Sequence, residues 1–204
     1  MDAIYLVRHG QTNWNQKGRL QGILDVGLNH IGVLQSLRLA KILRQTRMRF
    51  IFSSPLSRAC GTAGIIGRLM GHPVIVDDNL REIDHGAWSG MMLPVIARRY
   101  PEEFAMWQSA PDRLKISDGE TLKKAYQRAS RFLLHLIRGK LMGNVLVVSH
   151  GVSNAMMLCA ALGAPLSCMV TIPQPNLQVH VIRFQGREVT GVESLISWGQ
   201  IPQS

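Results

Sequence analysis

The chain has 204 residues, of which 46% are hydrophobic, and its formal net charge at pH 7 is +10. The hydrophobic content supplies the core of one domain and excludes wholesale disorder. No apolar run reaches the roughly 18 residues that a membrane span needs, so no membrane partner is expected.

The three cysteines, Cys60, Cys159 and Cys168, are widely spaced and match neither a zinc ligand set nor a disulfide framework. A strand is expected to begin after two residues, which leaves no room for a signal peptide. A cytoplasmic location is therefore expected. The positive charge suggests an anionic partner, but the basic residues are scattered and form no nucleic-acid motif, so no nucleic-acid partner is expected. A small phosphorylated substrate needs only a few of the arginines, and a solvated basic surface explains the rest.

The first predicted element is a buried strand over residues 4–7, which ends at Arg8, His9 and Gly10. In open α/β sheets, ligands bind at the carboxyl ends of strands. A polar loop over residues 13–28 follows the strand and is a candidate binding segment.

The later elements follow from apolar periodicity and from capping residues. Helices are predicted over 29–47, 57–70, 91–100, 101–108, 121–137 and 152–162, and strands over 50–52, 74–76, 144–148, 179–184 and 189–196, with frayed residues after 196. This order predicts a three-layer α/β/α sandwich with a mainly parallel sheet, an antiparallel edge and an edge strand at 74–76. We expect one domain over 1–204, with residues 91–118 forming a helical insert over the active site. The basic face of the 121–137 helix is expected to be solvated.

The strand over 144–148 repeats the design of the first strand, because Ser149, His150 and Gly151 follow it. Two strands that each deliver a histidine and a glycine to one sheet edge indicate a catalytic site. A single such histidine would more often be structural.

The candidate residues suit phosphoryl transfer. Two guanidinium groups, those of Arg8 and Arg58, can bind the oxygens of a tetrahedral anion. One neutral imidazole can attack phosphorus, while the other, protonated, stabilises the charge of the transition state. A carboxylic acid, assigned to Glu82, can protonate the leaving group and later activate water.

No residue pattern suits magnesium or zinc, and the phosphate-binding glycine motif and the serine nucleophile elbow are both missing from the sequence. The chemistry that remains is a histidine-based reaction that needs no metal and no cofactor.

Several segments resemble the histidine phosphatase superfamily, in its phosphoglycerate-mutase-like branch. The segments are Leu6-Val7-Arg8-His9-Gly10-Gln11-Thr12 with Trp14-Asn15, Gly18-Arg19-Leu20-Gln21-Gly22, Ser53-Ser54-Pro55-Leu56 with Arg58, Glu82 with Gly86 and Trp88, Gly119-Glu120-Thr121, and Val148-Ser149-His150-Gly151. Within this branch the chain is similar to broad-specificity and α-ribazole-phosphatase-like members.

The resemblance implies the α/β sandwich fold and a role for each matching residue. His9 would be the nucleophile, Glu82 the proton donor, and Arg8, Arg58 and His150 the phosphate pocket. Asn15, Gln21, Gly22 and Gly151 would add substrate contacts.

Related mutases usually carry an arginine-rich insert between the acid loop and the Gly-Glu-Thr element, and here that interval is short. A phosphomonoesterase acting on a small phosphorylated metabolite is therefore favoured over a phosphoglycerate mutase. An inactive phosphate-binding or signalling module is a further alternative. A homodimer is left open.

Overall fold

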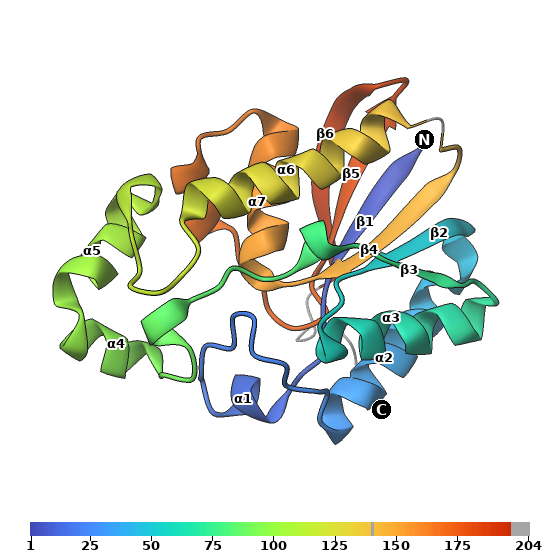
Figure 1. The fold of residues 1–204 in the computed structure, drawn as a ribbon. Helices are drawn as coiled ribbons and strands as arrows, with labels where there is room; N and C mark the ends of the chain where they lie inside the picture. Colours follow the sequence, from blue (N-terminus) through green and yellow to red (C-terminus); the bar gives the residue numbers. More distant parts are fainter. Residues whose placement is uncertain (140, 197–204) are drawn as a thin grey trace.

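The structure is a computed structural model, and it describes residues 1–139 and 141–196. Six strands form one sheet in the order β3-β2-β4-β1-β5-β6 (Figure 1). The strands are β1 (Ala3–Arg8), β2 (Met48–Ser53), β3 (Val74–Val76), β4 (Asn144–Ser149), β5 (Val179–Gln185) and β6 (Glu188–Ile196). The α-helices are α1 (Asn13–Gln16), α2 (His30–Leu43), α3 (Ser57–Met70), α4 (Leu93–Arg99), α5 (Pro101–Ser109), α6 (Leu122–Arg138) and α7 (Gly151–Leu162).

The sheet has the predicted mixture of strand directions. β3, β2, β4 and β1 run parallel to one another, and β5 and β6 continue the sheet antiparallel. The predicted α/β sandwich with an antiparallel edge is therefore confirmed, and β3 is an edge strand as expected. The predicted frayed residues after 196 lie outside the described part of the chain.

Alternating side chains of the central strands fill two cores, one on each face of the sheet. Ile4 and Leu6 of β1 belong to the core that includes buried residues of α6 and α7. Tyr5 and Val7 belong to the core that includes buried residues of α2 and α3. Figure 1 shows α2 and α3 together on one side of the sheet, with α6 and α7 on the other. Burial on both faces explains why the strands are continuous apolar runs.

Three local predictions need correction. The segment predicted as loop begins with a helix, α1, because Thr12 and Asn15 form a reciprocal capping box. The helix predicted to reach residue 47 ends at Leu43, and a 3₁₀ turn follows before Arg47, which adopts a left-handed conformation with φ of 49°. The last helix of the sandwich begins at Gly151 because His150 is its N-cap.

Gly10 allows two backbone segments to pack closely. A Cβ atom at Gly10 would lie 2.7 Å from the carbonyl oxygen of Gly32, and one at Gly32 would lie 2.2 Å from that of Gln11. The loop after β1 and the first turn of α2 therefore touch backbone to backbone, which fixes the position of the residues between them.

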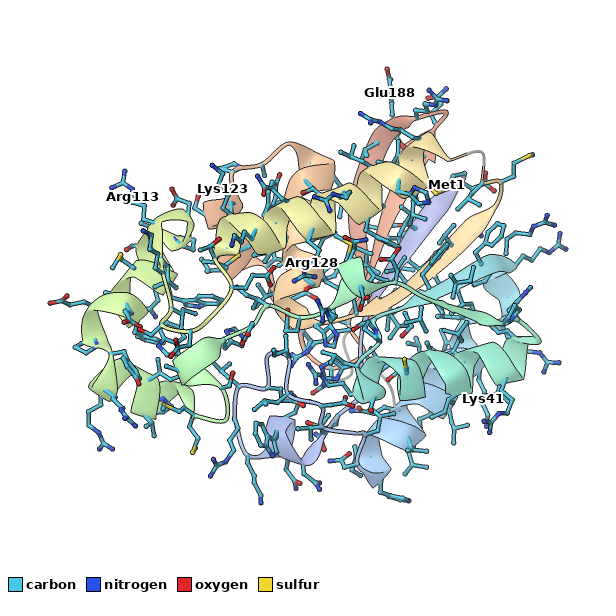
Figure 2. All side chains as sticks on the ribbon, viewed as in Figure 1. Met1, Lys41, Arg113, Lys123, Arg128 and Glu188 are labelled. Atoms are coloured by element: carbon cyan, nitrogen blue, oxygen red, sulfur yellow. The ribbon has the colours of Figure 1, made fainter. Side chains whose placement is uncertain are left out.

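The basic side chains differ in their surroundings. Figure 2 shows Lys41, Arg113 and Lys123 projecting outward from the fold, whereas Arg128 lies over its middle. Arg128 donates hydrogen bonds to the carbonyls of Asn79 and Arg81 and pairs with Glu120 at 2.9 Å. The prediction of a fully solvated face on this helix is wrong for Arg128, which ties α6 to the loop before Glu82.

Candidate active site

The two histidines lie side by side because the strands that precede them are neighbours. β1 and β4 pair in parallel, with Arg8 opposite Ser149. The next residues, His9 and His150, therefore lie at the same edge of the sheet, and their ring centroids are 5.2 Å apart.

The hydrogen bonds of His9 fix its tautomer. Nδ1 lies 2.7 Å from the carbonyl oxygen of Gly10, which can only accept, so Nδ1 carries the proton. Nε2 is left with its lone pair. Burial, followed by the positive charges of Arg8 and Arg58, holds the pKa of His9 well below its usual value of 6.5. The ring is therefore neutral and can act as a nucleophile.

Two guanidinium groups face the cavity beside His9, and both are held by backbone carbonyls. Arg58, near the start of α3, is 1% exposed and donates to the carbonyls of Leu24 and Gly22 at 2.8 and 2.6 Å. Burial lowers the pKa of Arg58 to about 10, so it stays charged at neutral pH. Arg8 donates to the carbonyl of Gln174, and burial lowers its pKa as well. Each guanidinium keeps an Nε atom without a partner among the described residues.

The loop between β1 and α2 forms one wall of the cavity. Asn15 accepts from the Thr12 backbone at 3.1 Å and from the Asn176 side chain at 3.2 Å. Thr12 also donates to the Gln21 side chain at 3.0 Å. Gly22 has a φ of 52°, which favours glycine, and its carbonyl holds Arg58.

Glu82 lies against the first turn of α7. Its carboxylate accepts from the backbone amides of Val152 and Ser153 at 3.2 and 3.1 Å, and from the Ser153 hydroxyl at 3.1 Å. The side chain is 8% exposed and lines the cavity. A helix N-terminus is a favourable place for a carboxylate.

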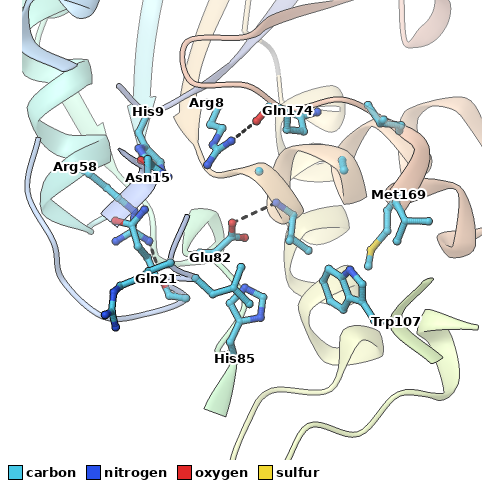
Figure 3. A pocket seen from close by; sticks show the side chains of 18 residues that line it. Arg8, His9, Asn15, Gln21, Arg58, Glu82, His85, Trp107, Met169 and Gln174 are labelled. Carbon is cyan, nitrogen blue, oxygen red and sulfur yellow. Dashed lines mark hydrogen bonds between the residues drawn. The ribbon is translucent and has the colours of Figure 1, made fainter. Parts of the chain in front are cut away.

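These side chains enclose one cavity of about 280 Å³ (Figure 3). Eight of the nine residues named from the sequence line it: Arg8, His9, Asn15, Gln21, Gly22, Arg58, Glu82 and Gly151. The exception is His150, which is fully buried beside His9, with Nε2 2.7 Å from the Ser54 hydroxyl. Burial and then the charge of Arg58 hold the pKa of His150 well below 6.5, so the neutral ring is favoured where the sequence analysis assigned a protonated one.

Sequence reasoning placed the 91–118 insert, which carries Trp107, over the site but did not name the residues of the wall opposite the guanidinium groups. Figure 3 shows Trp107 and Met169 on that side, with His85 below them. His85 lies edge-on to Trp107, with a centroid distance of 6.0 Å. The cavity lining also includes Arg19, Leu20, Val152, Ala155, Val170, Ile172 and Gln174. His85 lies in the segment of Glu82, Gly86 and Trp88 that the sequence analysis named. The aliphatic residues of the lining have no sequence feature that distinguishes them from ordinary core residues.

Residues 1–139 and 141–196 hold neither a metal-ligand cluster nor a membrane-spanning helix. No group of three or more His, Cys, Asp or Glu residues is arranged to hold a metal ion there. In the same residues, no helix has the length and apolar character needed to cross a membrane.

Comparison with known proteins agrees with this geometry. The model of the histidine phosphatase superfamily (branch 1) matches residues 4–195. Phosphoserine phosphatase 1 of Hydrogenobacter thermophilus is 37% identical over 187 residues, covering 92% of this chain and 89% of that protein. "Probable phosphoglycerate mutase GpmB" of Proteus mirabilis is 34% identical, covering 91% and 86%. The solved structure of Bacillus stearothermophilus YhfR has a TM-score of 0.84 and 30% identity, covering 92% of this chain and 93% of that one.

The chain therefore belongs to branch 1 of the histidine phosphatase superfamily. It is an enzyme of the phosphoric monoester hydrolase class.

Proposed function

We propose that this protein is a metal-independent phosphomonoesterase that acts through a phosphohistidine at His9 on a small phosphorylated metabolite. The single observation that carries the proposal is the environment of His9. Its Nδ1 proton is held by the Gly10 carbonyl, its Nε2 is free, and two guanidinium groups face the same cavity.

In the first step, Nε2 of His9 attacks phosphorus and the bond to the leaving-group oxygen breaks. Arg8 and Arg58 bind the oxygens of the transferring group and balance its negative charge, which is the task that a metal ion performs in other phosphatases. Glu82, protonated at the start of this step, gives its proton to the departing oxygen.

In the second step, water attacks the phosphohistidine. Glu82, now ionised, accepts a proton from the water, and the bond between phosphorus and Nε2 breaks to release inorganic phosphate. The proton that Glu82 gains restores the starting state. The backbone amides of Val152 and Ser153, in the first turn of α7, hold the Glu82 carboxyl group beside the cavity.

Hydrolysis is favoured over a mutase reaction by the charges that line the cavity. Among the described residues, three arginines line the cavity: Arg8, Arg19 and Arg58. The lining does not include the arginines of the 91–118 segment, which are Arg98, Arg99 and Arg113. A mutase has to bind a second phosphate group on the same substrate, which calls for more cations than one phosphate requires.

The name of the Hydrogenobacter relative makes O-phosphoserine the first substrate to test. A screen of phosphorylated metabolites for phosphate release should accompany it. Incubation with 3-phosphoglycerate separates the two activities: release of phosphate supports the phosphatase, and isomerisation primed by 2,3-bisphosphoglycerate contradicts it.

The covalent step is tested by quenching the reaction with ³²P-labelled substrate in alkaline detergent. Label should stay on the wild-type protein in an acid-labile, base-stable form, as expected for phosphohistidine. His9→Ala should carry no label and should not hydrolyse p-nitrophenyl phosphate. Label retained by His9→Ala would contradict the assignment of the nucleophile.

A further inference from the structure

The side chain of Ser54 contacts the second histidine directly. Ser54 follows the last residue of β2, and its amide donates to the Val148 carbonyl of β4 at 3.0 Å. Its hydroxyl oxygen lies 2.7 Å from Nε2 of His150, and both residues are fully buried. This contact joins two segments that are 96 residues apart.

The protons around this contact can be placed by counting donors and acceptors. The backbone amide of Leu56 donates to the Ser54 hydroxyl at 3.3 Å, so one lone pair of the oxygen is occupied. The hydroxyl has one proton to donate, and within the described residues Nε2 of His150 is the acceptor that it contacts. If Nε2 carried the proton instead, both the serine proton and Nδ1 of His150 would lack partners.

The first arrangement leaves one group unpaired, the proton on Nδ1 of His150. Nδ1 is buried and has no hydrogen-bond partner among the described residues. A buried donor without a partner is costly, unless a ligand supplies the acceptor. The ring centroids of His150 and His9 are 5.2 Å apart, so a phosphoryl group on His9 would bring acceptor oxygens close to the His150 ring.

We propose that Ser54 is a positioning residue that holds Nε2 of His150 as an acceptor, and so aims the Nδ1 proton at the phosphoryl group. The inference rests on the proposed function in assigning a phosphoryl partner to His150. The tautomer itself is independent of catalysis and can be measured without it.

The charges around His150 agree with a neutral donor. Burial disfavours a second proton on the ring, and the positive charges of Arg58, Arg8 and Arg128 act in the same direction. The hydroxyl of Ser54 can nevertheless turn and accept from Nε2 if a dianionic substrate draws a proton onto the ring. An alanine at position 54 can neither donate a hydrogen bond to Nε2 nor accept one from it.

The direct test is ¹⁵N NMR of the wild-type protein with labelled histidine at pH 7.5. The signals of His150 are assigned by their loss in His150→Gln. We expect a protonated Nδ1 and an unprotonated Nε2 for His150. A protonated Nε2 in the wild-type protein would overturn the proposal, whatever the variants do.

The kinetic test uses Ser54→Ala, with Ser53→Ala as the matched control. The Ser53 hydroxyl bonds to the Ser54 carbonyl and does not touch the imidazole. Ser54→Ala should lower kcat by about 10- to 100-fold and shift the His150 tautomer toward Nε2–H. Ser54→Cys, which keeps a proton donor of similar size, should recover part of the loss, and Ser53→Ala should keep the wild-type tautomer.

Each outcome has one meaning. An unchanged kcat and tautomer in Ser54→Ala would overturn the positioning role. If Ser54→Ala does not fold, the tautomer of His150 in the wild-type NMR spectrum decides whether the proposal holds. If the spectrum is as expected but no phosphomonoester is hydrolysed, the contact between Ser54 and His150 stands and the proposed function fails.

Discussion

Replacing Arg58 with methionine should remove phosphate binding while leaving the folded state nearly as stable as the wild type. Methionine replaces the aliphatic part of the arginine side chain with an unbranched, flexible apolar chain and carries no charge. Arg58 is therefore the position where the requirements of function and of stability are expected to oppose each other most directly.

The magnitude follows from two opposing terms. Lowering a guanidinium pKa from 12.5 to about 10 means that burial of this cation costs roughly 3 kcal/mol, which the methionine variant regains. The variant loses two hydrogen bonds from a charged donor, to the carbonyls of Gly22 and Leu24, worth about 1.5–3 kcal/mol each. The net loss is therefore about 0–3 kcal/mol, so the thermal midpoint should fall by no more than about 12 °C.

The assay is thermal unfolding with and without orthovanadate, together with phosphate release. Vanadate should raise the midpoint of the wild type and not that of Arg58→Met, and kcat/KM should fall by about 10²- to 10³-fold. Arg68→Met, in the last turn of the same helix, is the control and should keep the vanadate effect. A vanadate effect of full size in Arg58→Met would refute the assignment of Arg58 to the phosphate pocket. A fall in the midpoint of more than about 15 °C would refute the balance of energies.

Four further outcomes are expected. Glu82→Gln should slow hydrolysis most for alkyl phosphates, whose leaving groups need a proton; equal losses for alkyl and aryl esters would argue against an acid role. EDTA should leave activity unchanged, and a loss that a divalent ion restores would contradict metal independence. The pKa values of His9 and His150 are held well below 6.5 in the folded protein. Below about pH 6.5 both imidazoles therefore bind protons in the unfolded state and stay neutral in the folded state. Stability against urea should therefore be full above pH 6.5 and fall between pH 6.5 and 5, and a flat profile would contradict the burial of these rings. Gly32→Ala should lose about 2–4 kcal/mol of stability, because a Cβ atom there meets a backbone carbonyl at 2.2 Å, while Gly64→Ala, with open space around it, should be neutral or stabilising.

The sheet and the paired histidines could be predicted because their signals are local. An apolar run that ends at a glycine marks a buried strand and its end, and parallel strands bring their ends to the same edge. His9 and His150 therefore follow from two short stretches read separately. The strand order, with β1 between β4 and β5, needed the structure, since nothing local encodes which strands become neighbours.

The wall of the cavity opposite the guanidinium groups could not be predicted for a different reason. Trp107 lies on a short helix, and Met169 lies in a 3₁₀ turn that has no regular apolar period. Whether such side chains face a core or a cavity depends on packing between distant segments. Ser54 illustrates the same limit, because its motif was evident while its contact with His150 appears only when β2 and β4 pair.

Arg58, Arg8 and Arg128 all rest on main-chain oxygens: those of Gly22 and Leu24, of Gln174, and of Asn79 and Arg81. A backbone carbonyl oxygen is still present after a substitution at its own residue, as long as the backbone conformation does not change. Side chains on these loops can therefore be substituted without releasing the arginines. The specificity for the phosphate ester can therefore change while phosphate binding is retained. These loops are suitable positions for engineering the substrate specificity.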